Sequence, residues 1–406
     1  MKQNIYKIIA VSSVSLALFF FVSCSEDVTP SLYDLSSQSI ATPVITSITP
    51  PNQGLAGITP LTISGSNFSA TAKNNFVYFN GKPGTVLSAT STQLVVLAPN
   101  VVADTVLVKM AVLQSDKFSN IYPYKLVTAW EEYYPFDPIA EKAYGIIIDN
   151  SGNLLVNLFD IGIWKITPNK QKTLYIPKGN TQKWDNFRFG PANELYGARS
   201  ARGIWKLVEN VAPASPWAAP SAGTLIALEF DNQQNIWALN ASNNLFRIKQ
   251  DKTITSFPFT GVLRAIRIFD NAIYVGATKD NIEGVWKIPI LPTGDLGTEE
   301  LYFDITNVKT AAKVTAIAFA ADGDLIIGTD KGPNPILVVK PDKSSTELYP
   351  DVIGANSVVS MYWPTTGTSL FFVRGEERDA AGTKILVSQT PIRVEMERIG
   401  APYYGQ

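Results

Sequence analysis

One motif returns at a nearly constant interval along the chain and constrains its fold more than any other feature. Trp-Lys-Ile or Trp-Lys-Leu stands at Trp164, Trp205 and Trp286, and Leu245-Phe246-Arg247-Ile248 fills the same place between the last two. The steps from 164 to 205, from 205 to 246 and from 246 to 286 are 41, 41 and 40 residues. Repeats of this length are supersecondary units that bury their hydrophobic faces only by stacking on one another.

Hairpin signals recur together with this motif. Apolar residues flank turn-forming Asp, Asn, Gly or Pro at residues 148–154, 189–195, 230–236, 269–273, 319–325 and 363–370. Each hairpin is followed by two more short strands, so one unit holds about four strands and repeats every 40 to 50 residues or so, which is typical of a β-propeller. We therefore predict a propeller over residues 144–406, with six blades; the spacing is also compatible with five or seven.

The repeats resemble NHL-type propellers, with turns such as Pro341-Asp342-Lys343. Aromatic residues at one phase of a repeat are expected to pack between blades. They are Trp164, Trp205 and Trp286 at one phase, and Tyr196, Trp237, Tyr274 and Phe371 at another. Asp149, Asp231 and Asp270 stand where tight turns favour Asp or Asn, so we expect them to be turn formers. Residues 128–143 are expected to be a linker or the strand that closes the ring.

Residues 43–127 carry a different pattern, in which short β-branched runs alternate with turn residues. The runs are 44–49, 61–64, 76–79, 85–88, 93–97, 105–113 and 122–127. Asn80-Gly81 is a strong hairpin signal because both residues tolerate positive φ. Seven short strands favour an immunoglobulin-like sandwich. The predicted fold class is therefore all-β, a sandwich followed by a propeller.

The residues of this segment resemble the IPT/TIG family. Pro43-Val44-Ile45-Thr46-Ser47-Ile48-Thr49-Pro50 corresponds to the family's opening, and residues 57–68 (GITPLTISGSNF) correspond to its glycine-containing second motif. Residues 77–81 (VYFNG) and 93–99 (QLVVLAP) continue the pattern. The resemblance implies a domain that acts as a spacer.

The N-terminal segment reads as an export signal. Lys2 and Lys7 precede an apolar run at residues 8–22, which at about 1.5 Å per residue is too short for a hydrocarbon core of about 30 Å. A basic start and a short apolar run indicate a signal peptide over residues 1–23. Phe21-Val22-Ser23-Cys24 resembles the lipobox of bacterial lipoproteins, which implies acylation, such as palmitoylation, of Cys24. Phe21 replaces the usual Leu.

The residues after Cys24 indicate where the protein is sent. Ser25-Glu26-Asp27 resembles the acidic export signal of Bacteroidota surface lipoproteins, which implies an outer-membrane anchor facing the medium. Residues 24–42 are polar and rich in Ser and Thr, so we expect a flexible tether.

Composition excludes several functions. The chain has no His and one Cys, so His-based catalysis, disulfides and zinc–thiolate sites are excluded. Its formal net charge is −1, which gives no basic excess for nucleic-acid binding.

Candidate ligand-binding residues lie at positions that do not recur from repeat to repeat, or in the loops expected at the mouth of the propeller channel. Trp184 and Trp217 could stack on sugar rings, with polar partners in Arg199, Asn240 and Arg374. No motif specifies a metal site. If the propeller holds calcium, Glu283, Asp330 and Glu376 are the candidates; otherwise no cofactor is expected.

The export signals and the order of domains resemble those of lipoproteins that bind glycans beside outer-membrane nutrient importers. The first hypothesis is therefore non-catalytic binding of a poly- or oligosaccharide, with an outer-membrane transporter complex as a partner. A calcium-dependent propeller hydrolase or lyase and a protein-interaction scaffold are the alternatives.

Overall fold

The computed structural model describes residues 40–220, 223–240 and 243–405. Within these ranges the fold is all-β, as predicted, and the helical turns are the short 3₁₀ segments η2 (Ala72–Asn74) and η3 (Pro191–Asn193). No helix in the described ranges has the length and hydropathy needed to cross a membrane. The chain divides into two compact units. The first contains residues up to 49, 62–96 and 107–122, and the second contains residues 50–61, 97–106 and all residues from 123 on. Cys24, the signal segment and most of the tether lie outside the described residues.

The first part of the chain forms two sheets of an immunoglobulin-like sandwich. One sheet has the order β1 (Val44–Thr49), β3 (Pro60–Ser66), β7 (Gln93–Leu97) and β6 (Thr85–Ala89). The other has the order β2 (Gln53–Leu55), β9 (Tyr122–Val127), β8 (Ala103–Val112), β4 (Asn75–Phe79) and β5 (Lys82–Pro83). Asn80 and Gly81 have φ of 48° and 82°, so the predicted hairpin turn is confirmed between β4 and β5.

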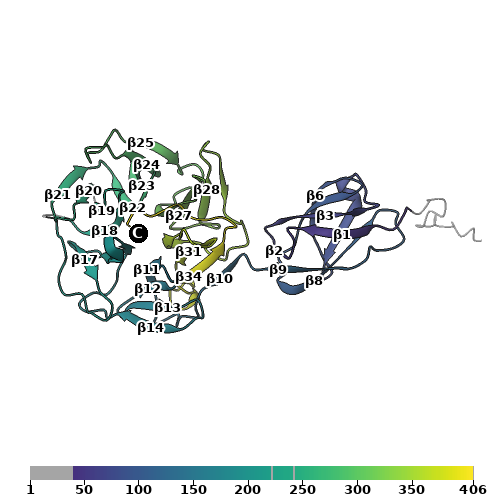
Figure 1. The fold of residues 1–406 in the computed structure, drawn as a ribbon, viewed down its shortest axis with the longest axis horizontal. Coiled ribbons are helices and arrows are strands. Elements are labelled where there is room, and N and C mark those ends of the chain that lie inside the picture. The colour runs from purple at the N-terminus through teal and green to yellow at the C-terminus, as the bar shows by residue number, and fades with distance from the viewer. Residues whose placement is uncertain (1–39, 221–222, 241–242, 406) are drawn as a thin grey trace, which may run out of the picture. The chain divides into compact units, whose positions relative to one another are not determined.

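The remaining strands form the blades of a propeller (Figure 1). Among the described residues six sheets follow one another along the chain, and the structure therefore has the predicted six blades. Blade one is β11 (Ala143–Ile148), β12 (Leu154–Leu158), β13 (Gly162–Ile166) and β14 (Lys172–Ile176); blade two is β15 (Asn186–Phe189), β16 (Leu195–Ala198) and β17 (Ile204–Leu207); blade three is β18 (Leu225–Phe230), β19 (Ile236–Asn240), β20 (Asn244–Ile248) and β21 (Ile254–Pro258). Blade four is β22 (Val262–Phe269), β23 (Ala272–Lys279), β24 (Ile282–Pro289) and β25 (Glu300–Asp304); blade five is β26 (Val314–Phe319), β27 (Leu325–Thr329), β28 (Ile336–Val339) and β29 (Ser345–Glu347).

Blade six joins the start of the propeller to its end. Its strands are β30 (Val358–Tyr362), β31 (Ser369–Arg374), β34 (Thr390–Glu395) and, on the outer edge, β10 (Trp130–Glu132). Between β31 and β34 the chain makes a separate hairpin of β32 (Glu377–Arg378) and β33 (Ile385–Val387). Because β10 precedes blade one, its pairing with β34 closes the ring through backbone hydrogen bonds.

The first strand of every blade lies innermost. Adjacent first strands contact one another in the cyclic order β11, β15, β18, β22, β26, β30 and back to β11. The hydrophobic clusters lie between neighbouring blades, each drawing residues from the sheets on both sides. The aromatic residues of both repeat phases belong to these clusters, so the prediction that they pack between blades is confirmed.

The C-terminal segment closes one end of the central channel. Ala401 N donates a hydrogen bond to Phe319 O, and Arg267 Nη2 donates to Ala401 O and Pro402 O at 2.9 and 2.8 Å. These contacts lie at the C-terminal ends of the inner strands. In Figure 1 the C-terminus is at the centre of the ring. In the part of the chain that the structure describes, the channel therefore opens toward the N-terminal ends of the inner strands.

Candidate functional site

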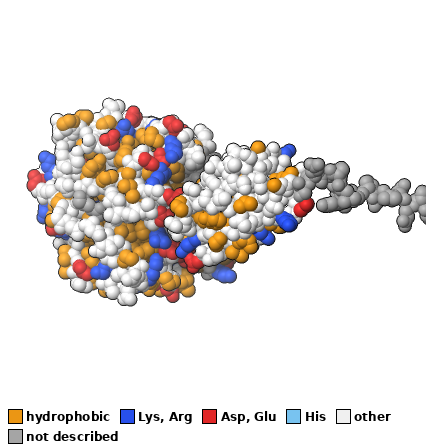
Figure 2. All heavy atoms as spheres, turned by 45° about the vertical axis from the view of Figure 1, so that its right-hand side comes forward, with side chains coloured by type: hydrophobic (Ala, Val, Ile, Leu, Met, Phe, Trp, Pro, Cys, Tyr) orange, Lys and Arg blue, Asp and Glu red, His pale blue; other side chains and the backbone are white. Residues whose placement is uncertain are grey.

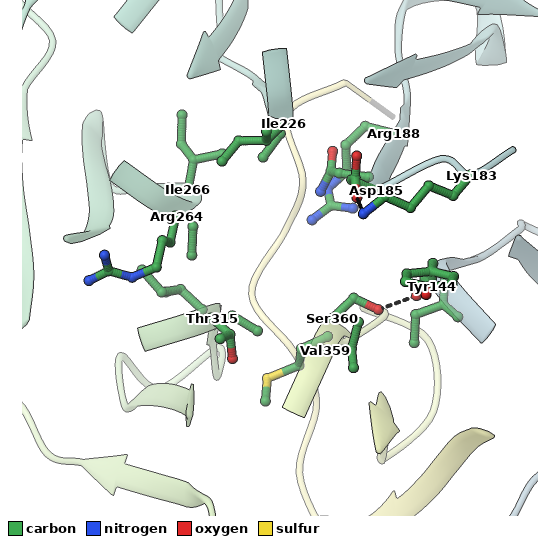
Figure 3. A pocket seen from close by; sticks show the side chains of 17 residues that line it. Tyr144, Lys183, Asp185, Arg188, Ile226, Arg264, Ile266, Thr315, Val359 and Ser360 are labelled. Atoms are coloured by element: carbon green, nitrogen blue, oxygen red, sulfur yellow. Dashed lines mark hydrogen bonds and ion pairs between the residues drawn. The ribbon is translucent and has the colours of Figure 1, made fainter. Parts of the chain in front are cut away.

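A cavity of about 320 Å³ occupies the open end of the channel, and all six inner strands contribute to its wall (Figure 3). Its lining is Tyr144, Ile146, Lys183, Asp185, Asn186, Arg188, Ile226, Ala227, Arg264, Ala265, Ile266, Thr315, Ala316, Ile317, Val359, Ser360 and Met361. In Figure 3 the pale C-terminal segment crosses behind it. A concave site with apolar walls and a few polar groups is the usual form of a small-ligand site.

Irregular strands shape the mouth of this cavity. Five of the six inner strands carry a β-bulge or register shift near their start, at the positions of Tyr144, Ile226, Arg264, Thr315 and Val359. All five side chains are half-buried, although most of the residues that follow them in the same strands are fully buried. Bulges re-aim side chains and occur beside functional sites. The extra residue thus turns one side chain per blade toward the opening.

Blade two supplies most of the charge. Lys183 and Asp185 form an ion pair of 2.7 Å at the rim, and Arg188 lies deeper (Figure 3). Arg188 Nε donates to Glu229 Oε1 at 2.7 Å and its Nη1 donates to Phe187 O at 2.9 Å. Burial alone would lower the pKa of Arg188, but the adjacent Glu229 carboxylate outweighs it and raises the pKa above its ordinary value. Arg188 is therefore a fixed, permanently charged group.

A second ion network borders the opposite side. Arg264 donates hydrogen bonds to Glu283 and to Thr278 Oγ1, and Lys313 Nζ lies 3.2 Å from Glu283 Oε2. The Val314 backbone N–H also donates to Glu283 at 2.9 Å. The buried Glu283 is thus held by cations and donors from blades four and five, and it supports Arg264.

The predicted aromatic contacts are not in this cavity. Trp184 is only 1% exposed and packs edge-on against Trp205, with ring centroids 5.7 Å apart. The prediction that Trp184 offers a free ring to a ligand is therefore wrong. Trp217 is partly buried against Tyr196, where the loop of residues 216–218 covers the edge of β17. It is not among the lining residues.

The predicted polar partners also act within the fold. Arg199 donates to Thr181 Oγ1 and lies over the Trp205 ring at 4.2 Å, and burial lowers its pKa. Asn240 Oδ1 accepts hydrogen bonds from the N–H groups of residues 243 and 244 and shapes a turn. The buried Arg374 donates to Glu132, which ties β31 to the closing strand. None of the three lines the cavity.

The three acids considered for calcium do not form one group of metal ligands, and each is bound by other groups of the protein. Glu283 is bound as described, and Asp330 Oδ1 accepts a hydrogen bond from the Lys313 N–H at 2.7 Å. Glu376 pairs with Lys142 and Arg378; burial raises its pKa, but these two cations hold it below its ordinary value. No group of three potential metal ligands comes together anywhere in the described ranges. The donor set therefore does not fit a calcium site built from these three residues.

Two charged residues of the cavity wall, Arg188 and Arg264, and two charged residues behind it, Glu229 and Arg267, could have been found from one signal. Inner strands are apolar, and a charged residue inside such a run is costly unless it is paired. Arg188, Glu229, Arg264 and Arg267 interrupt apolar runs in this way. Interruptions of the first strand, rather than residues of the rim loops, mark the channel.

Comparison with known proteins agrees with the fold. Residues 43–125 match the IPT/TIG domain family, which covers the sandwich and confirms the resemblance for that part of the chain. No curated protein matches the chain.

Solved structures from Bacteroides thetaiotaomicron are similar over most of the chain. A putative phosphatase is 12% identical with a TM-score of 0.55, covering 88% of this chain and 98% of its own. A structural genomics protein of unknown function is 14% identical with a TM-score of 0.50, covering 89% and 99%. An auxiliary nutrient binding protein is 11% identical with a TM-score of 0.47, covering 82% and 95%. The first two likenesses show a shared fold and assign no activity to this chain.

Proposed function

We propose that this protein is a lipid-anchored, non-catalytic protein of the bacterial outer surface that binds a poly- or oligosaccharide at the open end of its propeller channel. The observation that carries the proposal is the axial cavity, which combines apolar walls with hydroxyl, amide and charged groups. Such a surface suits a ligand with apolar C–H faces and many hydroxyls. Its volume is near the lower end of the range of about 300–1,000 Å³ for ligand sites, which favours the end of a glycan chain.

The predicted acylation site and export signal support the proposed location on the outer membrane. The chain has one thiol, Cys24, placed directly after a short apolar run with a basic start. Acylation there, followed by the acidic Ser25-Glu26-Asp27 and a polar tether, would hold the sandwich and propeller on the outer membrane beside a nutrient-uptake system. Cys24→Ala should abolish labelling with a palmitate analogue; labelling that persists would contradict the anchor.

A glycan array tests the binding. The chain from residue 25 on contains every residue that the structure describes, and it should bind one or a few related glycans, with or without calcium. Val359→Trp should reduce that binding at least about tenfold, because a half-buried bulge position at the cavity mouth would be filled. Leu174→Trp, at an exposed site on β14, is the matched control. Turnover of the bound glycan on adding calcium would favour a hydrolase or lyase instead.

A further inference from the structure

The cavity carries an excess of positive charge. Three cations, Lys183, Arg188 and Arg264, line it together with one acid, Asp185. The chain as a whole has a formal net charge of −1, and in Figure 2 charges of both signs are interspersed over the visible face. The excess is therefore a local property of the channel.

The groups behind the wall do not cancel this excess. Glu229 lies 2.7 Å from Arg188 and 3.8 Å from Arg267, so this layer adds one acid and one further cation. Glu283 likewise pairs with Arg264 and with Lys313. Because each buried acid is matched by an additional cation, the two net positive charges at the wall remain. Low-dielectric walls focus such a field into the cavity.

Arg188 is built to present part of its guanidinium to a ligand. The residue is 5% exposed, and its Nε and Nη1 are fixed by Glu229 and by Phe187 O. Among the residues that the structure describes, hydrogen-bond partners are found for its Nε and Nη1 and none for its Nη2, and Arg188 lines the cavity. Asn186, on the same strand, uses its Oδ1 to accept from Leu228 N at 3.1 Å. Blade two thus places a guanidinium, an amide and the Lys183 ammonium along one side.

The other side of the cavity differs in character. Ile266 and Ile317 provide apolar surface there, with the Thr315 hydroxyl beside them, and Arg264, which is paired with Glu283, lies on the same side. In Figure 3 Thr315 and Ile266 lie across the cavity from Arg188 and Lys183. A ligand that fits both sides has an anionic group at one edge and a C–H face with hydroxyls at the other.

Resting on the proposed function, we propose that the glycan is acidic, and that the sugar unit entering the channel carries a carboxylate that binds Arg188, with Lys183 at the rim. A uronic acid has this chemistry. Hydrogen bonds between a buried guanidinium and a carboxylate are among the stronger polar contacts in proteins, so the carboxylate, rather than the hydroxyl pattern alone, decides which glycan binds.

Calorimetric titration of matched trisaccharides tests the inference on the chain from residue 25 on. The panel contains galacturonate, glucuronate, mannuronate and guluronate trimers, each beside its carboxyl-reduced neutral counterpart. At least one uronate should bind about tenfold or more tightly than its neutral form, and the difference should shrink as salt is raised. Inorganic phosphate at the same concentration should not displace it.

Three variants locate the effect. Arg188→Lys keeps the charge but lacks the planar fork, so it should reduce the preference for the acid at least about tenfold, with folding checked by tryptophan fluorescence. Lys183→Gln changes a side chain that is 35% exposed, so it should leave folding intact and reduce the preference about threefold. Lys206→Gln is the matched control, because Lys206, on β17, is 36% exposed and pairs with Glu194, which directly precedes β16; neither residue lines the cavity. It should change nothing.

The outcomes separate this inference from the proposed function. Equal binding of the acidic and neutral trimers, or an unchanged preference in both Arg188→Lys and Lys183→Gln, would overturn the inference. If the array then still finds a neutral glycan whose binding is blocked by Val359→Trp, the proposed function stands without it. If phosphate displaces the uronate at equal concentration, the site recognises anions rather than acidic sugars, and the inference fails. If no glycan binds at all, the proposed function itself fails.

Discussion

Truncating Tyr403 to alanine should destabilise the whole propeller, although the residue lies three positions from the end of the chain. Its ring is 6% exposed and stacks on Tyr362, with centroids 4.6 Å apart and planes at 17°. The guanidinium carbon of Arg267 lies 3.6 Å from the ring centroid, and the hydroxyl oxygen accepts a hydrogen bond from the Trp363 N–H at 3.3 Å. One side chain therefore joins blades four and six to the C-terminal segment.

The size of the effect follows from these contacts. Truncation of a core aromatic residue costs about 3–5 kcal/mol. A cation–π contact contributes about 2 kcal/mol when it is desolvated, so we expect Tyr403→Ala to lie near the upper end of that range. Tyr403→Phe keeps the ring and loses only the hydrogen bond, which is worth about 0.5–1.5 kcal/mol.

Urea denaturation followed by tryptophan fluorescence measures this loss. The chain has eight Trp, and all of them lie between Trp130 and Trp363, so the signal reports the propeller and not the sandwich. Tyr404→Ala, at the neighbouring half-buried position, is the control and should cost clearly less than Tyr403→Ala. A loss below about 1 kcal/mol for Tyr403→Ala, or equal losses at the two positions, would refute the view that the C-terminal segment is an integral part of the ring.

Three further predictions concern packing, pH and ring closure. Trp205→Ala should cost about 3–5 kcal/mol as a core truncation, while leaving the affinity for any identified glycan unchanged, as measured by denaturation and titration. Burial raises the pKa of Asp324, but hydrogen bonds from Lys340 and Arg398 hold it below its ordinary value. The ionised Asp324 therefore stabilises the fold fully above a pH of about 4, and this stabilisation is lost as the pH falls further. Asp324→Asn should weaken the acid dependence of urea midpoints between pH 5 and 3. A chain that starts at residue 128 keeps β10 and should fold cooperatively. A chain that starts at residue 136 lacks β10 and the buried Tyr133, so its thermal unfolding, followed by circular dichroism, should show much lower stability. If both chains are unfolded, the expected domain boundary is wrong.

Most of the fold could be predicted because its determinants are local and repeated. Each Trp-Lys-Ile copy marks a third strand, and its aromatic residue has to be buried against the next blade. The paired Asp149 and Asn153 of the first hairpin illustrate the turn chemistry: Asp149 Oδ1 accepts from the N–H groups of Ser151 and Asn153 at 2.9 Å each. Such turns and periods are readable in a single sequence.

Blade two lacks the fourth strand of the other blades, and the cause lies in a proline-rich segment that the repeat pattern does not explain. Its sheet has three strands, and residues 216–218 lie along the free edge of β17, with Trp217 N donating to Ile204 O at 2.7 Å. Pro213, Pro216 and Pro220 prevent this segment from forming a regular ladder. Trp217 then packs on Tyr196, so a tryptophan outside the repeat phase has a structural partner that no periodicity reveals.

The candidate site was harder to predict because it depends on bulges. An extra residue in an inner strand shifts the alternation of inward and outward side chains by one. Arg264 and Arg267 therefore both lie on the inner strand of blade four yet have different surroundings: one borders the mouth and the other contacts the C-terminal segment. A regular alternation would place Arg264 and Arg267, which are three residues apart, on opposite faces of the sheet, so it does not reveal that both lie along the channel, and attention goes instead to the loops at the channel mouth.

The same geometry explains how a ring of similar blades can hold an asymmetric site. Positions such as Trp205 and Trp286 are constrained by packing between sheets, so they repeat from blade to blade. The bulge positions face the opening and are only half-buried, so packing does not require the same residue in every blade. These positions are Tyr144, Ile226, Arg264, Thr315 and Val359. Blade two, with no such irregularity in its inner strand, presents Asn186 and Arg188 instead. Recognition by this fold therefore rests on the positions where the repeat breaks down, and those are the positions to vary when a ligand is sought.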